Sequence, residues 1–278
     1  HHPNETSRTL PSSLILISKT MKTIAISGKG GTGKSTIAAM IIRWLSDQGI
    51  RSILAVDADS NVNLNQLLGV ELKETVGSIR EEMKTMAANI PGGMTKQQFL
   101  EYKIQNSLVE SPQFDLLAMG RPEGPGCYCY ANNLLRDLLK TLSENYEYVV
   151  IDNEAGMEHL SRRTAQNIDC LLIISDPFPR GIQASGKINR LIKELDSRVR
   201  ERHLILNRAP LPVPESVKKS VEEEKLDLLG LIPEDELIMK RDQEGRPIWP
   251  VLDNSSAFKA LDKLMNKLGL IKKGDDAP

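Results

Sequence analysis

A glycine-rich segment near the start of the chain has the residue types and spacing of a triphosphate-binding loop. Residues 28–35 read Gly-Lys-Gly-Gly-Thr-Gly-Lys-Ser and fit the pattern G-x-x-x-x-G-K-[ST]. Such glycines let backbone N–H groups turn toward phosphates, Lys34 is expected to reach the β- and γ-phosphates, and Ser35 is expected to bind Mg²⁺. We therefore predict an ATP site. Its predicted loop residues are Gly28, Lys29, Gly30, Gly31, Thr32, Gly33, Lys34, Ser35 and Thr36.

The same glycines permit a second interpretation. Gly28, Gly30 and Gly33 also match the dinucleotide pattern G-x-G-x-x-G, and an acidic residue lies about twenty residues further on. The Lys34-Ser35 pair directly after the last glycine argues against this alternative. A triphosphate explains a cation at the start of the helix, whereas the dinucleotide pattern does not require one. NAD or FAD therefore remains only the alternative to ATP.

Three aspartates follow apolar runs and are candidates for the magnesium site. Asp57 and Asp59 are two residues apart, so an extended backbone directs both side chains to one side. Asp152 follows the apolar run Tyr148–Ile151. A hard cation bound to phosphates needs oxygen ligands nearby, so Ser35, Asp57 and Asp152 are the predicted magnesium residues. For a lone carboxylate after a strand, the alternative is the N-cap of a helix.

The glycine-rich loop and the three aspartates are distant in sequence, so the fold must bring them together. The alternation of apolar runs and helical patterns along the chain predicts a β-sheet that can do so. The predicted strands are Thr23–Ser27, Ser52–Val56, Asp115–Met119, Tyr148–Ile151, Cys170–Ser175, His203–Leu206 and Asp227–Ile232. The predicted helices are Ser35–Gln48, Asn132–Ser143, Ile182–Asp196, Ser216–Lys225 and Ala257–Leu268. Strands that are apolar throughout indicate helices on both faces of a parallel sheet. We predict a doubly wound α/β fold with a mostly parallel sheet of seven to eight strands.

Ligands of such sheets bind beyond the carboxyl ends of the strands. Each of the seven predicted strands is followed by polar or thiol residues, so we expect these residues to meet at one edge. Residues 21–278 are expected to form a single domain. Residues 1–20, which begin with His1-His2, are expected to be a disordered tag or non-native extension before a natural start at Met21.

The composition of the chain restricts the partners that it is expected to bind and the cellular compartment that it is expected to occupy. The formal net charge is −1, so no general electrostatic attraction to nucleic acid or anionic lipid is expected. No apolar run approaches the ~18 residues that a membrane-spanning helix needs. Three cysteines and no export signal indicate a reducing compartment, and we expect the chain to be cytoplasmic. Cys170 lies in an apolar strand and is expected to pack in the core.

The segment Lys29–Ser35 resembles the deviant Walker A motif of the MinD/ParA/Mrp class, which includes the nitrogenase iron protein. In that class the early lysine, here Lys29, crosses a dimer interface to the phosphates of the partner's ATP. The resemblance implies a homodimeric ATPase whose catalytic residues are Lys29, Lys34 and Asp59, with Asp59 acting on the attacking water. Residues 152–156 resemble the switch II segment of the class. The resemblance further implies an adenine pocket formed by Asn207, Arg208, Pro233, Glu234 and Asp235.

The loop Gly120–Tyr130 contains two cysteines, Cys127 and Cys129, separated by one residue. Both thiolates can bind one ion but cannot complete a four-coordinate site alone. A symmetric dimer supplies four sulfurs on its two-fold axis. Four thiolates suit Ni²⁺ or Zn²⁺ and could also hold an iron–sulfur cluster, so these three possibilities remain open. Buried small residues or adventitious thiols are the other interpretation.

The chain resembles the CooC family over almost all of residues 21–270. The most specific parts of this resemblance are the Gly120–Tyr130 loop and the segments Asp152–Leu160 and Asp176–Gly181. That family consists of nickel-inserting ATPases that mature carbon monoxide dehydrogenase, with related factors for acetyl-CoA synthase. It implies ATP, Mg²⁺ and a nickel or zinc ion shared between subunits. Two alternatives remain. One is a spatial organiser like MinD or ParA, with the apolar stripe of residues 258–268 as anchor. The other is a reductase like the nitrogenase iron protein.

Overall fold

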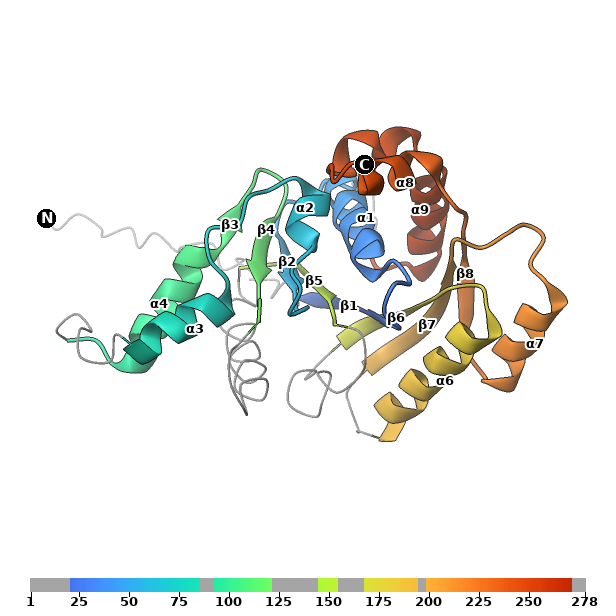
Figure 1. Ribbon diagram of the computed structural model, residues 1–278, viewed down its shortest axis with the longest axis horizontal. Coiled ribbons are helices and arrows are strands. Elements are labelled where there is room, and N and C mark those ends of the chain that lie inside the picture. Colours follow the sequence, from blue (N-terminus) through green and yellow to red (C-terminus); the bar gives the residue numbers. More distant parts are fainter. Residues whose placement is uncertain (1–20, 86–92, 122–144, 155–167, 195–198, 272–278) are drawn as a thin grey trace, which may run out of the picture.

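A computed structural model describes residues 21–85, 93–121, 145–154, 168–194 and 199–271, and its centre is an eight-stranded sheet. The strands are β1 (Lys22–Gly28), β2 (Ile53–Asp57), β3 (Val109–Glu110), β4 (Asp115–Ala118), β5 (Tyr148–Asp152), β6 (Ile168–Ser175), β7 (Val199–Asn207) and β8 (Leu228–Ile232). Their spatial order is β3-β4-β2-β5-β1-β6-β7-β8 (Figure 1). All neighbours are parallel except β3 and β4. The predicted doubly wound, mostly parallel sheet is confirmed.

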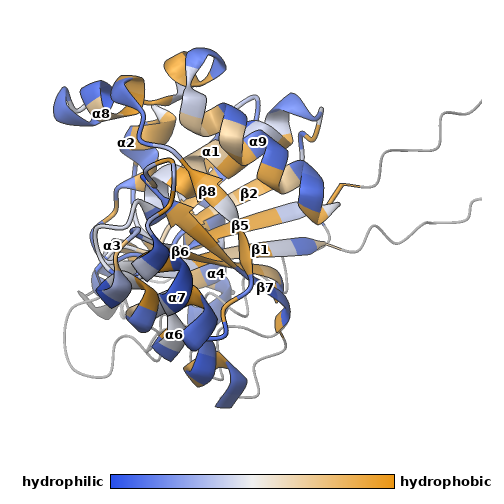
Figure 2. Ribbon diagram, turned by 90° about the vertical axis from the view of Figure 1, so that its right-hand side faces the viewer, coloured by the Kyte–Doolittle hydropathy of each residue, from blue (hydrophilic) through white to orange (hydrophobic). Residues whose placement is uncertain are grey.

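Helices cover both faces of this sheet, which is why its central strands are apolar throughout. The helices are α1 (Lys34–Asp47), α2 (Leu64–Leu68), α3 (Val76–Thr85), α4 (Lys96–Ser107), α6 (Pro179–Glu194), α7 (Glu215–Glu223), α8 (Glu236–Gln243) and α9 (Ser256–Leu268), with a 3₁₀ helix at Trp249–Asn254. Buried residues of α1, α2 and α9 form one core, and those of α3, α4, α6 and α7 form the other. Figure 2 shows α1, α2 and α9 on one side of the strands and α6 and α7 on the other.

All seven predicted strands and four of the five predicted helices are present, with ends that shift by a few residues. The predicted helix at residues 132–143 lies outside the described residues. The prediction missed β3, α2, α3, α4 and α8. Of these helices, α4 buries only Leu100, Ile104 and Ser107 and α8 buries none of its residues, so the apolar periodicity of both is weak. The capping box formed by Thr95 and Gln98 was a readable signal for the start of α4.

The register of the central strands aligns the residues that were expected to do chemistry. Asp152 lies beside Ile26 of β1 on one side and beside Asp57 of β2 on the other. Gly28 ends β1 next to Ile174 of β6. Because these strands are parallel, the phosphate loop and both aspartates reach the same edge of the sheet. The expectation that polar residues follow the strand ends to one edge is confirmed for this part of the chain.

Two features of the sequence lie in the core: the apolar stripe of residues 258–268, for which an anchor was the alternative, and Cys170, for which a core position is predicted. The stripe on α9 packs inward, since Phe258, Leu261 and Met265 are buried. Cys170 is a buried free thiol on β6, and burial raises its pKa to about 12. A thiol in this state stays protonated and is inert at neutral pH. None of the described helices is long and apolar enough to cross a membrane.

Candidate nucleotide site

The phosphate loop leaves β1 at Gly28 and enters α1 at Gly33, and both positions exclude a side chain. A Cβ at Gly28 would lie 2.3 Å from the carbonyl oxygen of Ile174, so β6 approaches too closely. Gly33 has a φ of +89° and would place a Cβ 2.4 Å from Nδ2 of Asn207. Gly33 is also the N-cap of α1, and no side chain of the described residues caps this helix start. The first N–H groups of α1 are therefore free of the usual side-chain acceptor, as a phosphate site requires.

Side chains from the end of β7 brace the backbone of this loop. Nδ2 of Asn207 donates a hydrogen bond to the carbonyl oxygen of Thr32 at 2.9 Å. The guanidinium of Arg208 donates to the carbonyl oxygen of Gly31. Within the loop, the Thr32 hydroxyl donates to the carbonyl oxygen of Lys29 at 2.9 Å. Asn207 and Arg208 thus hold the loop, and their predicted contact with adenine stays a prediction.

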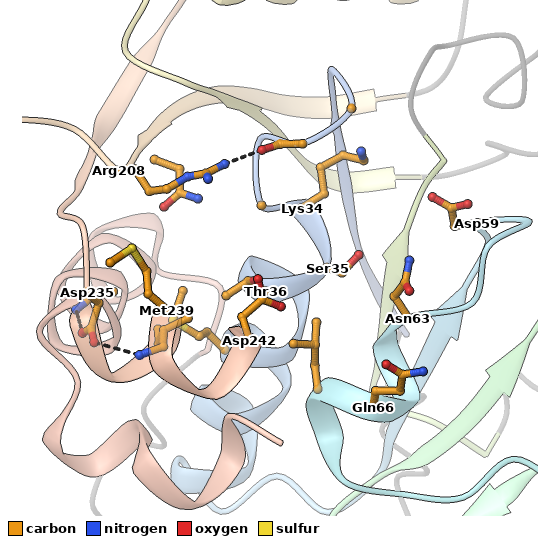
Figure 3. Close-up of a pocket in the computed structure, with 18 of the residues that line it drawn as sticks. Lys34, Ser35, Thr36, Asp59, Asn63, Gln66, Arg208, Asp235, Met239 and Asp242 are labelled. Atoms are coloured by element: carbon orange, nitrogen blue, oxygen red, sulfur yellow. Dashed lines mark hydrogen bonds between the residues drawn. The ribbon is translucent and has the colours of Figure 1, made fainter. Parts of the chain in front are cut away.

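The two lysines of the loop have different surroundings. Lys34, at the first position of α1, is only 7% exposed and lines the cavity (Figure 3). Lys29 is exposed and does not line the cavity. A buried ammonium needs a negative partner, which the phosphates of a nucleotide supply.

A cavity of about 570 Å³ extends from the phosphate loop across the start of α1 to α8. Figure 3 shows Lys34, Ser35 and Thr36 on its floor, with Asp59, Asn63 and Gln66 on one side and Arg208, Asp235, Met239 and Asp242 on the other. Predicted residues that line it are Gly30, Gly31, Gly33, Lys34, Ser35, Thr36, Asp59, Asn207, Arg208, Pro233 and Asp235. The cavity lining does not include Gly28, Lys29, Thr32, Asp57, Asp152 and Glu234.

Asp57 is fully buried and organises the loop that follows β2. Its Oδ1 accepts the backbone N–H of Asp59 at 3.1 Å, and its Oδ2 accepts those of Asn63 at 3.0 Å and Leu64 at 2.9 Å. Burial raises the pKa of Asp57 to about 6, and these N–H donors offset part of that shift. With three donors already bound, the carboxylate shapes the path of the Asp59 loop. Its predicted support of Mg²⁺ stays a prediction.

Asp152 is buried to the same degree, but neither of its carboxylate oxygens has a hydrogen-bond partner among the described residues. Burial raises its pKa to about 7, and the Ser35 hydroxyl and Lys34 nearby counteract the shift. A buried charge without a partner is costly unless a cation or proton compensates it. A carboxylate, a hydroxyl and phosphate oxygens are the hard ligands that Mg²⁺ prefers. The unpaired oxygens of Asp152 beside Ser35 therefore fit a magnesium site.

This setting predicts a pH-dependent effect of removing the charge. The pKa of Asp152 is about 7 in the folded chain, above the usual 3.8, so its contribution to stability is lost as the pH rises between these values. Without Mg²⁺, Asp152→Asn is expected to raise the free energy of unfolding by about 1–3 kcal/mol at pH 8 and by much less at pH 4.5. Urea unfolding at both pH values measures the difference.

Asp57→Asn is the matched comparison, because the carboxylate of Asp57 accepts three N–H groups, whereas that of Asp152 accepts none among the described residues. An amide has only one oxygen, so this variant is expected to lower stability at pH 8. A loss of stability in Asp152→Asn at pH 8 would contradict the unpaired state of that carboxylate.

Asp59 lies two residues after Asp57 and lines the cavity. Its Oδ1 accepts the backbone N–H of Asn61 at 2.8 Å, which folds the tip of the loop, and Glu154 lines the cavity with it. Asp59 is partly exposed, so water reaches it. The arrangement suits a carboxylate that contacts a water molecule near the phosphates.

The far end of the cavity consists largely of residues that sequence reasoning missed. Met40, Leu67, Ile238 and Met239 provide apolar surface, and Gln66, Asp242 and Arg246 provide polar groups. Several come from α2 and α8, two helices without a strong pattern. Asp235 caps α8 by accepting the N–H groups of Leu237 and Ile238, and it also accepts Oγ–H groups of Ser255 and Ser256 and the N–H of Ala257. Its role is thus to join α8 to α9 beside the pocket.

The predicted metal ligands Cys127 and Cys129 lie outside the described residues, as do His159 and Gly156 of the segment after Asp152. Within the described ranges, no three His, Cys, Asp or Glu side chains gather in a way that could hold a metal ion.

Comparisons with known proteins agree with this geometry. Residues 23–248 match the family model of the CobQ/CobB/MinD/ParA nucleotide binding domain. An ATP-binding protein of Methanocaldococcus jannaschii is 42% identical over 247 residues, 88% of this chain and 97% of that protein. The carbon monoxide dehydrogenase accessory protein CooC of Rhodospirillum rubrum is 34% identical over 233 residues, 80% of this chain and 87% of that protein. The structure of Pyrococcus horikoshii MinD with Mg-ADP shares the fold, with a TM-score of 0.67 and 23% identity over 90% of this chain and 96% of that one.

Proposed function

We propose that this chain, which belongs to the CobQ/CobB/MinD/ParA family of nucleotide-binding domains, hydrolyses ATP as a homodimer and supports nickel insertion into carbon monoxide dehydrogenase or acetyl-CoA synthase. The observation that carries the ATPase proposal is a cavity where Lys34, the uncapped start of α1 and the Ser35 hydroxyl meet beside the unpaired carboxylate of Asp152. Each of these groups is compensated when a magnesium triphosphate binds.

The chemistry follows from the positions of the side chains. The N–H groups of the loop and Lys34 bind the phosphates and stabilise the charge on the β–γ bridging oxygen as its bond to the γ-phosphorus breaks. Ser35 and Asp152 would hold Mg²⁺, which neutralises charge on the β- and γ-phosphates. Asp59 orients the attacking water and accepts its proton, and ADP and phosphate are the products. Asn207 and the apolar wall around Met239 contact the base.

The homodimer rests on the exposure of Lys29. Because Lys29 is exposed and lies outside the cavity lining of its own subunit, it is available to the phosphates bound by a second copy. A second copy also brings a second Cys127/Cys129 pair, so that four thiolates meet on the two-fold axis. In this proposal ATP binding draws the two subunits together, and hydrolysis separates them.

The cargo of the proposed dimer is a thiophilic metal ion. Thiolates stay reduced in the cytoplasm, where we place this chain, and four of them bind Ni²⁺ or Zn²⁺ well. Nickel is our choice because the CooC relative is named an accessory protein of carbon monoxide dehydrogenase. An iron–sulfur cluster is the alternative for the same sulfurs, and an absorbance spectrum of anaerobically purified protein separates a coloured cluster from a single ion.

Sizing by light scattering, with anaerobic metal analysis, tests the proposal. With Mg²⁺, Ni²⁺ and a non-hydrolysable ATP analogue, the chain is expected to elute as a dimer with about one nickel ion per two subunits. A chain that remains a monomer under these conditions would contradict the proposal.

A further inference from the structure

The two loops that flank the phosphate end of the cavity are joined by one hydrogen bond between side chains. The hydroxyl of Ser60 donates to Oε1 of Glu154 at 2.9 Å. Ser60 is the neighbour of Asp59, and Glu154 lies two residues after Asp152. Asp59 and Glu154 both line the cavity, so this bond lies at its wall.

A backbone hydrogen bond joins the bases of the two loops, from the N–H of Ala58 to the carbonyl oxygen of Asp152 at 2.9 Å. Asn153 is buried and donates twice to the carbonyl oxygen of Ile26, from its backbone N–H at 3.1 Å and from Nδ2 at 2.8 Å. These bonds fix the chain directly before Glu154 to β1. On the other side, Asp57 holds both ends of the Asp59 loop by accepting the backbone N–H groups of Asp59, Asn63 and Leu64. Beyond this backbone bond, the Ser60–Glu154 bond links the tip of the Asp59 loop to the segment after β5 through side chains.

We propose that Ser60 and Glu154 form a latch that positions Asp59 for the attacking water and couples it to the segment beginning at Asp152. The proposal rests on the proposed ATPase function, in which Asp59 acts on that water. Ser60 and Glu154 are positioning residues, because they act through the Asp59 loop. A movement of Glu154 would then carry Asp59 with it.

A substitution at Glu154 can distinguish a positioning role in the latch from a direct role as a general base or metal ligand. A latch needs only an oxygen that accepts the Ser60 hydroxyl, which the amide of glutamine also provides. A general base or a metal ligand needs the negative charge, which glutamine lacks. The latch also makes the two residues dependent on each other, so removing both should cost no more than removing either.

The test compares ATP hydrolysis by Ser60→Ala, Glu154→Ala, the double variant and Glu154→Gln in the presence of Mg²⁺. Each alanine variant and the double variant are expected to lose about tenfold in kcat with KM unchanged. Glu154→Gln is expected to stay within about twofold of the parent chain. Binding of a fluorescent ATP analogue, expected to be unchanged, reports that each nucleotide site is intact.

Two results would overturn the latch. One is a Glu154→Gln variant as slow as Glu154→Ala, which would assign the role to the charge. The other is a double variant whose loss equals the product of the single losses. Asp59→Ala, measured alongside, keeps the two proposals apart. If it hydrolyses ATP as fast as the parent chain, the proposed role of Asp59 fails, whereas an inactive Asp59→Ala with additive alanine variants rejects only the latch.

Discussion

An equal mixture of Lys29→Ala and Lys34→Ala chains is expected to hydrolyse ATP, although each variant alone is expected to lose at least about a hundredfold in kcat. The reason is that a nucleotide site in the proposed dimer uses Lys34 of the subunit that holds it and Lys29 of the other subunit. In a mixed dimer, one site has both lysines and the other has neither. Random pairing makes half of the dimers mixed, so the mixture should recover about one quarter of the parent activity.

The measurement is phosphate release at constant total protein as the ratio of the two variants changes. Activity should peak at equal amounts and fall toward zero at either end. The surroundings of the two lysines predict a further difference between the variants. Lys34 is buried at the loop, so Lys34→Ala should weaken ATP binding by a single subunit. Lys29 is exposed, so Lys29→Ala should leave ATP binding by a single subunit unchanged. A mixture no more active than its parts would place Lys29 in its own subunit's site.

Nickel binding is expected to disappear in the Cys127→Ser, Cys129→Ser double variant, while ATP binding and hydrolysis by the phosphate loop remain. Serine hydroxyls are far weaker ligands than thiolates for a soft or borderline metal ion. Anaerobic equilibrium dialysis with Ni²⁺, followed by metal analysis, measures the bound ion in the presence of Mg²⁺ and a non-hydrolysable ATP analogue.

The third cysteine of the chain provides the matched control. Cys170 is buried in β6 with a pKa raised to about 12, so it cannot supply a thiolate near neutral pH. Cys170→Ala should keep the full nickel content and lose only the packing of a small side chain. If the double serine variant binds as much nickel as the Cys170→Ala control, the cargo site lies elsewhere and the metal part of the proposed function fails.

The phosphate loop and the sheet could be predicted because their signals are local. Glycines, a lysine and a hydroxyl residue must follow one another in order for the backbone to wrap a phosphate, so residues 28–35 display the site within eight positions. Apolar runs separated by helical patterns indicate a parallel sheet without knowledge of the order of its strands. The edge where polar residues meet then follows from the common direction of the strands.

The tertiary structure decided how two similar aspartates differ. Asp57 and Asp152 both end apolar strands, and both were assigned to magnesium on the same grounds. Only the folded chain shows that Asp57 is satisfied by three backbone N–H groups while Asp152 has none among the described residues. The difference arises because α2 turns the loop after β2 back onto Asp57, whereas the groups beside Asp152, namely Ser35 and Lys34, are distant in sequence.

The far wall of the pocket and the Ser60–Glu154 bond also required the structure. Met239 and Asp242 belong to α8, which buries none of its own residues and so leaves no apolar stripe to find in the sequence. Ser60 and Glu154 are separated by 94 positions and meet because β2 and β5 are neighbours in the sheet. The sequence by itself predicts which residues bind phosphate, because such contacts are made by consecutive residues. Contacts between distant segments depend on strand order and loop paths, which only the packed chain specifies.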